Sequence, residues 1–202
     1  MGRILFARHA ETTWGSEERL QGWAPVQLTD GGREQAAALA GALADRDPDR
    51  LLAADLHPAL RTAQPVAEAT GLDPVPDHAW RAQDLGRLQG LPAAEALEQF
   101  PRFSVARRGE AALTERPDGG ESSRAASDRV LDAVDGLVAE LGAAETVVVV
   151  TYGGVVRTVR GEVRDEDVAP TVERSVPPAS VTVVAVEDGT RSVVAADETD
   201  HL

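Results

Sequence analysis

The sequence predicts an α/β protein of three layers, with a largely parallel central sheet that carries helices on both faces. Short apolar runs, each passing into a polar or glycine-rich turn, alternate along the chain with segments of helical hydrophobic spacing. Near the carboxyl end, two further apolar runs are separated by a tight turn. Strands that alternate with helices favour parallel pairing, and the final pair of runs favours a closing hairpin.

Three apolar runs predict the buried parallel strands. They are residues 3–7, 51–54 and 146–150. Ligands of open α/β sheets bind outside the carboxyl ends of the strands, so the segments that follow these runs are the places to look for a site. Those segments are Arg8-His9-Ala10-Glu11, Asp55-Leu56-His57-Pro58 and Thr151-Tyr152-Gly153-Gly154.

Amphipathic helices are predicted between the strands. The first begins after Thr29 or Asp30, either of which suits an N-cap, and its apolar stripe is Ala36, Leu39, Ala40 and Leu43. The second follows Ser122-Ser123 and has the stripe Val130, Val134, Leu137, Val138 and Leu141, with Gly142 where a C′ glycine belongs. A third helix is expected through Val155-Val156-Arg157, so that N–H groups at its start can hold an anion.

The closing hairpin is predicted from residues 179–186 and 191–196, which flank the turn sequence Glu187-Asp188-Gly189. No internal repeat or linker divides the chain. Its 202 residues are therefore expected to form one domain, long enough to bury a continuous core.

The composition predicts an acidic, soluble, cytoplasmic protein. The net charge is −14, which disfavours nucleic-acid and anionic-membrane partners, because both need a basic face. The longest apolar run spans residues 147–150, far less than a membrane crossing, and no secretory leader follows Met1. Cysteine is absent, which fits the cytoplasm. Lysine is absent too, a bias expected of a GC-rich bacterial genome.

Five groups of residues occur in an order that matches one known family. They are Arg8-His9-Ala10-Glu11-Thr12 with Arg19-Leu20-Gln21-Gly22 and Leu28-Thr29; residues 53–63; Asp84-Leu85-Gly86 with Gln89-Gly90; Pro117 with Gly119-Gly120-Glu121-Ser122; and Thr151-Tyr152-Gly153-Gly154. In these motifs the chain resembles the histidine phosphatase family, in its phosphoglycerate mutase-like branch. The resemblance implies one such domain over residues 1–202. Residues 100–118 stand in the place of a substrate-covering insertion, so a lid is expected there, with a plain irregular surface loop as the alternative.

The resemblance implies phosphoryl transfer through a phosphohistidine. In the family a His attacks phosphorus, two Arg and a second His bind the phosphoryl oxygens, and a carboxylic acid protonates the leaving oxygen. His9 matches the nucleophile and Arg8 the first phosphate-binding Arg.

The other three family positions do not match. Pro58 stands where the second Arg belongs, Ala82 where the acid belongs, and Tyr152 where the second His belongs. Losing a charge-assisted donor costs roughly 1.5–3 kcal/mol, and losing a general acid costs about 10²–10⁴ in rate. Together these changes are expected to remove on the order of 10⁴-fold or more of phosphatase activity.

Two arginines are candidates to replace the missing one as ligand-binding groups. Arg61 lies one helical turn beyond Pro58, although a solvent-facing helix residue is the more ordinary interpretation. Arg81 stands beside Ala82 and is expected either to bind an anionic ligand or to pair with Asp84.

Further candidates come from the scarce aromatic residues and from the remaining histidines. Trp14 and Trp80 are expected either to line a pocket mouth or to pack in the interior. His57 is expected to be a capping or solvated residue, and His78 and His201 structural ones. The four His residues lack metal-ligand spacing, so neither a metal nor another cofactor is predicted.

Three functions follow from these observations. The favoured one is a repurposed pocket in which His9 and Tyr152, with Arg8 and Glu11 near them, carry out non-redox acid–base chemistry on a small molecule in bacterial specialised metabolism. The second is a non-catalytic relative, a pseudophosphatase that binds a ligand or partner. The third is residual phosphotransfer through phospho-His9, helped by Arg61, Arg81, and the helix start at Gly153 and Gly154. Homodimerisation is an open alternative to a monomer.

Overall fold

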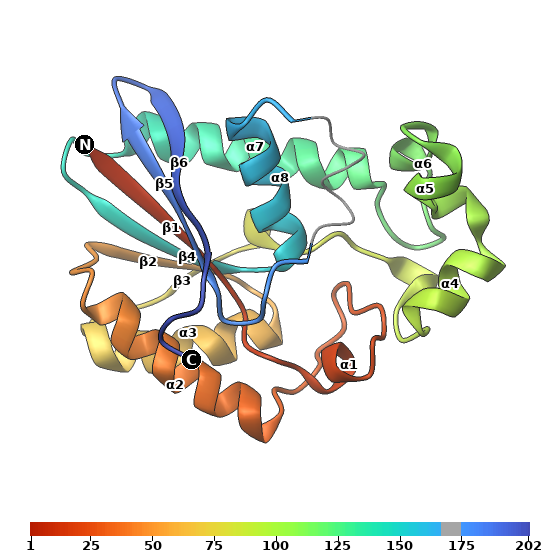
Figure 1. Ribbon diagram of the computed structural model, residues 1–202, viewed down its shortest axis with the longest axis horizontal. Coiled ribbons are helices and arrows are strands. Elements are labelled where there is room, and N and C mark those ends of the chain that lie inside the picture. The colour runs from red at the N-terminus through yellow and green to blue at the C-terminus, as the bar shows by residue number, and fades with distance from the viewer. Residues whose placement is uncertain (167–174) are drawn as a thin grey trace.

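A single sheet organises the computed structural model, which describes residues 1–166 and 175–202. Its six strands have the order β3-β2-β4-β1-β5-β6 (Figure 1). Neighbours among β1, β2, β3 and β4 pair parallel, whereas β5 pairs antiparallel with both β1 and β6. The strands are β1 (Gly2–Arg8), β2 (Arg50–Ala54), β3 (Val75–Asp77), β4 (Thr146–Thr151), β5 (Val181–Glu187) and β6 (Thr190–Glu198). The predicted α/β class with a largely parallel sheet is confirmed.

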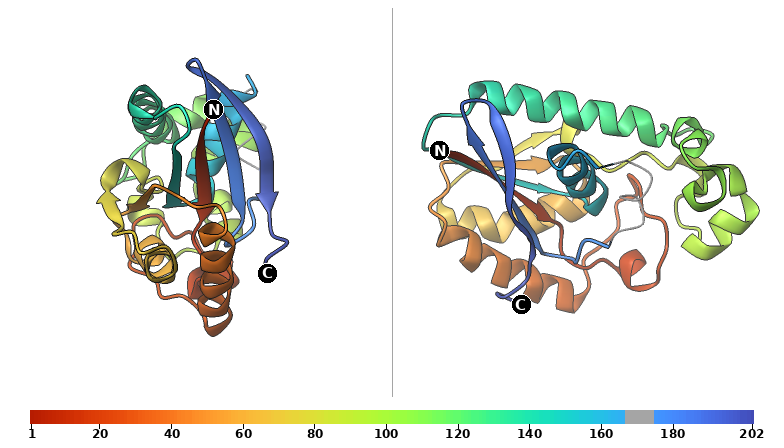
Figure 2. Two further views of the ribbon diagram at one scale, coloured as in Figure 1. Left: turned by 90° about the vertical axis from the view of Figure 1, so that its left-hand side faces the viewer. Right: turned by 45° about the horizontal axis from the view of Figure 1, so that its top comes forward.

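Long helices cover both faces of this sheet. Helices α2 (Asp30–Ala44) and α3 (His57–Thr70) lie together on one face, and α7 (Ser123–Glu140) and α8 (Gly153–Val163) on the other (Figures 1 and 2). The buried residues of α2 include Ala36, Leu39, Ala40 and Leu43, the predicted stripe. The three-layer arrangement is therefore the one that the hydrophobic spacing indicates.

Shorter elements connect the layers. They are α1 (Thr13–Ser16), η1 (His78–Trp80), η2 (Gly86–Leu88), α4 (Ala93–Gln99), η3 (Pro101–Phe103), α5 (Val105–Arg108) and α6 (Ala111–Thr114). Helices α4, α5 and α6 gather at one end of the molecule, beyond the carboxyl ends of β1 and β4 (Figure 1). The irregular structure expected for residues 100–118 is wrong in part, because η3, α5 and α6 are short helical turns.

The predicted helix starts are confirmed by their caps. The Thr29 hydroxyl accepts from Gly32 N at 2.8 Å, and the Ser122 hydroxyl accepts from Ala125 N at 3.2 Å. Gly142 differs from its expectation as a left-handed C′ glycine. It follows the C-cap Leu141, but its φ is not positive, and its N–H donates to the Glu145 carboxylate at 2.8 Å instead.

The closing hairpin is confirmed at residues 181–198. Its turn residues Asp188 and Gly189 have φ values of 49° and 78°. Two consecutive left-handed residues are the geometry of a tight turn that matches the twist of the flanking strands.

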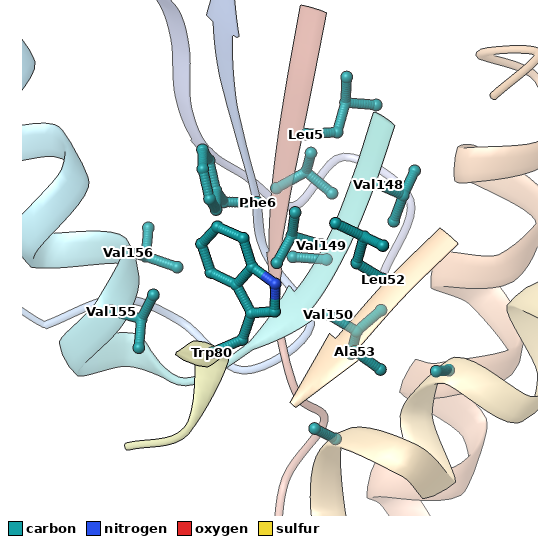
Figure 3. Packing of buried hydrophobic residues seen from close by; sticks show 14 of the residues in the cluster. Leu5, Phe6, Leu52, Ala53, Trp80, Val148, Val149, Val150, Val155 and Val156 are labelled. Atoms are coloured by element: carbon teal, nitrogen blue, oxygen red, sulfur yellow. The ribbon is translucent and has the colours of Figure 1, made fainter. Parts of the chain in front are cut away.

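Trp80 lies inside the core. It is 2% exposed, and its ring meets that of Phe6 edge-on, with centroids 6.1 Å apart. Figure 3 shows the indole between Val149 on one side and Val155 and Val156 of α8 on the other, with Phe6 next to the ring. The expectation that Trp80 lines a pocket mouth is therefore wrong, because the indole fills the space between the sheet and α8.

Across residues 1–166 and 175–202, none of the helices combines the length and the apolar character that crossing a bilayer would take.

Candidate active site

The three segments singled out at the strand ends come together. β1 and β4 are neighbours in register, and His9 N donates to Thr151 O at 2.7 Å just beyond the last paired residues. The Thr62 hydroxyl on α3 accepts from Ala10 N at 3.0 Å and donates to Pro58 O at 2.8 Å. The first turn of α3 is therefore fixed against the residue that follows His9.

His9 is a buried, neutral imidazole with a defined tautomer. Its side chain lies in a residue that is 3% exposed, and Nδ1–H donates to Ala10 O at 2.7 Å. Because a carbonyl oxygen only accepts, Nε2 keeps its lone pair. Burial, followed by the positive charge of Arg8, lowers the pKa of His9 to about 3. At neutral pH this ring offers a nucleophile or a hydrogen-bond acceptor at Nε2.

Tyr152 faces that ring from the start of α8. The two ring centroids are 4.6 Å apart at 64°, an edge-on contact. Tyr152 is 4% exposed, and its hydroxyl has no hydrogen-bond partner among the described residues. Burial, and then the negative charge of Asp55, raises the pKa of Tyr152 far above its ordinary value. The phenol therefore stays protonated and can donate one hydrogen bond into the site.

Arg8 lies across the start of α8 beside this pair. One of its terminal nitrogens donates to Val176 O, and its buried Nε has no partner in the described part of the chain. Burial, followed by the charge of Arg157, lowers the pKa of Arg8 to about 10. A Cβ on Gly153 would stand 3.3 Å from Arg8 Cδ, so the glycine gives the arginine room. Gly154, the other glycine at this helix start, is exposed.

Arg81 is occupied by a carboxylate other than the expected one. Its Nε and one terminal nitrogen donate to the two oxygens of Asp55 at 2.5 and 2.6 Å, so the expected Asp84 partner is wrong. The guanidinium also lies 4.4 Å from the centroid of the Trp23 ring. The pair with Arg81 lowers the pKa of Asp55, which keeps the carboxylate ionised.

Three of the residues considered lie elsewhere. Arg61 is exposed on α3 and donates to His57 Nε2 and Gln64 Oε1, both at 3.3 Å. Glu11 accepts from the Thr29 hydroxyl at 2.7 Å, which ties its loop to the start of α2. Trp14 packs against Gly90, where an added Cβ would stand 3.2 Å from the indole. No contact brings Arg61, Glu11 or Trp14 to the ring pair of His9 and Tyr152 in the described structure.

The other histidines have structural surroundings. His57 Nδ1 lies 3.0 Å from Val26 O, and His201 Nε2 lies 3.0 Å from Ala179 O. His78 is exposed beside Asp77. Over the described ranges, no three His, Cys, Asp or Glu side chains form a group that could hold a metal.

Sequence reasoning missed part of the site. Asp55 stood in one of the three segments but was given no role of its own, and Trp23 had no motif to mark it. Arg157 lies one helical turn beyond Gly153, a spacing that could have indicated its position beside Arg8. Arg129 donates to the carbonyls of Ala79 and Arg81 at 2.9 and 3.1 Å, and no pattern in the sequence signals this role.

A small cavity adjoins the site between α7 and α8. It measures about 90 Å³, and its lining includes Arg81, Ser127, Gly154, Arg157 and Thr158. A separate groove of about 400 Å³ lies between α2 and α3 and is lined in part by Arg61. Neither of these two cavities is lined by His9 or Tyr152. Both residues are buried, so the ring pair is covered in this structure.

Known proteins are similar to this chain in sequence and in fold. A phosphoglycerate mutase-like protein 4 from Arabidopsis thaliana is 35% identical over 157 residues, which make up 77% of this chain and 68% of that protein. A glucosyl-3-phosphoglycerate phosphatase from Mycolicibacterium vanbaalenii is 34% identical over 160 residues, or 76% of this chain and 70% of that protein.

Solved structures are similar to this chain in fold. Bacillus stearothermophilus YhfR matches with a TM-score of 0.89 at 27% identity, over 100% of this chain and 99% of that one. A mycobacterial glucosyl-3-phosphoglycerate phosphatase in complex with VO3 matches with a TM-score of 0.85 at 29% identity, over 98% and 99% of the two chains. The sequence pattern of the histidine phosphatase superfamily (branch 1) matches residues 4–199. The chain therefore belongs to the histidine phosphatase superfamily.

Proposed function

We propose that this member of the histidine phosphatase superfamily has lost most phosphomonoesterase activity and uses His9 and Tyr152 for non-redox chemistry on a small molecule. The proposal is carried by one observation: a neutral imidazole lies edge-on against a buried phenol whose hydroxyl has no partner among the described residues. An acceptor and a donor side by side suit an uncharged polar group of a ligand, such as a carbonyl.

The charges around the pair argue against efficient transfer of a dianionic phosphoryl group. Arg81 is neutralised by Asp55, and Arg8 donates to a backbone carbonyl. Pro58 and Ala82 offer neither a cation nor an acid where the family pattern has them. A flattening phosphoryl group is stabilised chiefly by such cationic donors, so their loss should cost several powers of ten in rate.

The reaction that fits is attack on, or proton abstraction next to, an electrophilic carbonyl. His9 Nε2 supplies the lone pair, and the Tyr152 hydroxyl donates a hydrogen bond to the carbonyl oxygen as negative charge develops there. Arg8 adds a positive charge nearby. No cofactor is needed for such a step. The protein is proposed to work in the cytoplasm of a bacterium.

Two nitrophenyl esters with the same leaving group test this proposal. p-Nitrophenyl acetate presents a neutral carbonyl, and p-nitrophenyl phosphate presents a dianion. Wild type should hydrolyse the acetate at least about tenfold faster than His9→Ala, and Tyr152→Phe should lose about 10-fold or more, the size of one lost donor. Arg61→Gln is the matched control and should keep the wild-type rate. Equal acetate hydrolysis by wild type, His9→Ala and Tyr152→Phe would refute the proposal.

Two alternatives each have an observation in their favour. The near-complete burial of His9 and Tyr152 favours a non-catalytic binding protein, for which none of the variants would change any ester hydrolysis. The fixed Nε2 lone pair of His9 and the phosphatase relatives favour residual phosphotransfer. That function predicts acid-labile phosphate on His9 after incubation with p-nitrophenyl phosphate, and none on His9→Ala.

A further inference from the structure

The carboxylate of Asp55 is paired with Arg81 beside the candidate active site. We propose that Arg81 is a binding site for the carboxylate of a small-molecule ligand and that Asp55 occupies this site whenever the ligand is absent. The inference rests on the proposed function in one respect, because it takes His9 and Tyr152 as the place where the bound ligand reacts. It adds the substrate class, a small carboxylic acid with a second, uncharged polar group.

Arg81 is held in a fixed position to receive a planar anion. Trp23 stacks on one face of its guanidinium, and the Trp23 indole is itself fixed by an Nε1–H bond to Ala82 O at 2.8 Å. Arg129 donates to the Arg81 carbonyl at 3.1 Å and to the Glu121 carboxylate at 2.6 Å, which anchors the backbone at Arg81. A guanidinium held in this way presents its two-pronged edge with little entropy left to lose.

Asp55 already shows which shape fits. Both of its oxygens accept from Arg81, the parallel two-bond arrangement that a free carboxylate adopts with arginine. The side chains of Asp55 and Arg81 are 27% and 24% exposed, so water can solvate the aspartate when it leaves. Because the pair is about one quarter exposed, solvent screens part of the attraction between Asp55 and Arg81.

A second arginine and a helix start line the cavity beside Arg81. Arg157 lines the same 90 Å³ cavity as Arg81, and the charge of Arg157 reaches Arg8 strongly enough to lower its pKa. The start of α8, at Gly154, opens on this cavity and adds a positive helix end.

A carboxylate on Arg81 would lie near the proposed reacting groups. The charges of both Asp55 and Arg81 act on the Tyr152 hydroxyl, the first raising and the second lowering its pKa. The cavity beside Arg81 has room for a group of a few non-hydrogen atoms. A carboxylate bound to Arg81 in place of Asp55 would lie within the same electrostatic reach of the Tyr152 hydroxyl.

Removing the internal competitor provides the test. A tethered carboxylate competes at an effective concentration of about millimolar or more, so its loss should strengthen the binding of a free carboxylate at least about tenfold. The probe is acetate, titrated at constant ionic strength, and the readout is tryptophan fluorescence, because Trp23 lies against Arg81. Asp55→Ala should bind acetate at least tenfold more tightly than wild type, and Asp55→Ala/Arg81→Gln should not bind it.

Controls separate this result from general effects of charge and folding. Arg61→Gln in the Asp55→Ala background removes one arginine outside the cavity and should leave acetate affinity unchanged. Adding Trp23→Phe should remove the fluorescence change, while calorimetry still detects binding. Asp55→Asn preserves the shape of the side chain and gives a second folded variant with tighter acetate binding than wild type.

Several outcomes would overturn the proposal. Unchanged acetate affinity in both Asp55 variants, or acetate binding that survives Arg81→Gln, would show that the pair is only structural. Phosphate binding to Asp55→Ala as tightly as acetate would contradict the carboxylate assignment. None of these binding measurements involves turnover. The acetate titrations can therefore refute the Arg81 site while the ester test supports the proposed function, or support the site while the ester test refutes that function.

Discussion

His9 couples the stability of the fold to pH. Its pKa is lowered to about 3 in the folded protein, whereas an unfolded histidine titrates near 6.5. Below pH 6.5 the unfolded chain therefore takes up a proton that the folded chain does not. This contribution to stability is fully present above about pH 6.5 and is lost as the pH falls toward 3, by up to about 1.4 kcal/mol per pH unit.

Urea denaturation of wild type and His9→Gln at pH 5, 6 and 7 measures that coupling. The unfolding free energy of wild type should fall more steeply than that of His9→Gln as the pH decreases through this range. The window lies above the region where Asp55, with its lowered pKa, contributes in the same direction. Parallel curves for the two proteins would mean that His9 is solvated rather than buried.

Tyr152 should show a conflict between stability and function. Its buried hydroxyl lacks a partner among the described residues, and an unsatisfied buried polar group costs about 1–3 kcal/mol. Tyr152→Phe should therefore leave the unfolding free energy unchanged or raise it by about 1 kcal/mol, while it lowers acetate-ester hydrolysis. A Tyr152→Phe variant destabilised by more than about 2 kcal/mol would indicate a structural hydrogen bond instead.

At the scale of elements, glycine-to-alanine substitutions at two positions of α2 should change the unfolding free energy in opposite directions. A Cβ on Gly32 would stand 2.1 Å from Glu11 O, which also accepts from Thr29 N at 3.1 Å. Gly32→Ala should thus push the His9 loop away from α2 and cost about 2–3 kcal/mol. Gly41, near the other end of the same helix, has nothing within 4 Å, so Gly41→Ala should gain about 0.5–1 kcal/mol.

Thermal or urea unfolding of the two alanine variants measures the difference between these sites. Equal effects of Gly32→Ala and Gly41→Ala would mean that the loop carrying His9 does not rest on the start of α2.

Arg129 of α7 helps to fix the segment bearing Arg81. It is about one fifth exposed, and it joins the carbonyls of residues 79, 81 and 82 to the Glu121 carboxylate. Arg129→Gln should cost about 2–3 kcal/mol in unfolding free energy, the size expected for lost charge-assisted bonds. Arg124→Gln, on the exposed side of the same helix, should change stability by less than about 0.5 kcal/mol. If Arg129→Gln lowered the unfolding free energy no more than Arg124→Gln does, the hydrogen bonds of Arg129 would not stabilise the fold.

The elements were predictable from sequence because burial leaves a periodic pattern. The strand at 146–150 and the stripe through Ala36, Leu39 and Leu43 follow from hydrophobic spacing alone, and Thr29 and Ser122 follow from capping chemistry. The turn after α7 was not predictable in this way. Gly142 does not adopt a left-handed conformation there, and its N–H donates to the Glu145 carboxylate instead. Short helical turns such as α5 and α6 carry too few residues to show a period.

At the scale of the whole molecule, parallel pairing brings the strand ends together, so the meeting of His9 with Tyr152 could be expected from order along the chain. The partners of individual side chains could not be predicted from the sequence, because they depend on the angles between elements. Asp55 follows β2 and Arg81 follows η1, and nothing in the sequence distinguishes Asp55 from Asp84 as the partner of Arg81. Trp80 likewise reveals its place in the core only when α8 is packed on the sheet.

We propose that Pro58, Ala82 and Tyr152 have disabled a phosphoryl-transfer site within an intact fold. Hydrolysis of p-nitrophenyl phosphate by wild type, beside the Pro58→Arg/Ala82→Glu/Tyr152→His variant, tests it most directly. Wild type should be nearly inert, and the triple variant should gain at least about 100-fold, a gain that His9→Ala removes. The proposal would be contradicted if wild type already hydrolysed p-nitrophenyl phosphate through His9, so that His9→Ala lost the activity, and if the triple variant were no faster than wild type.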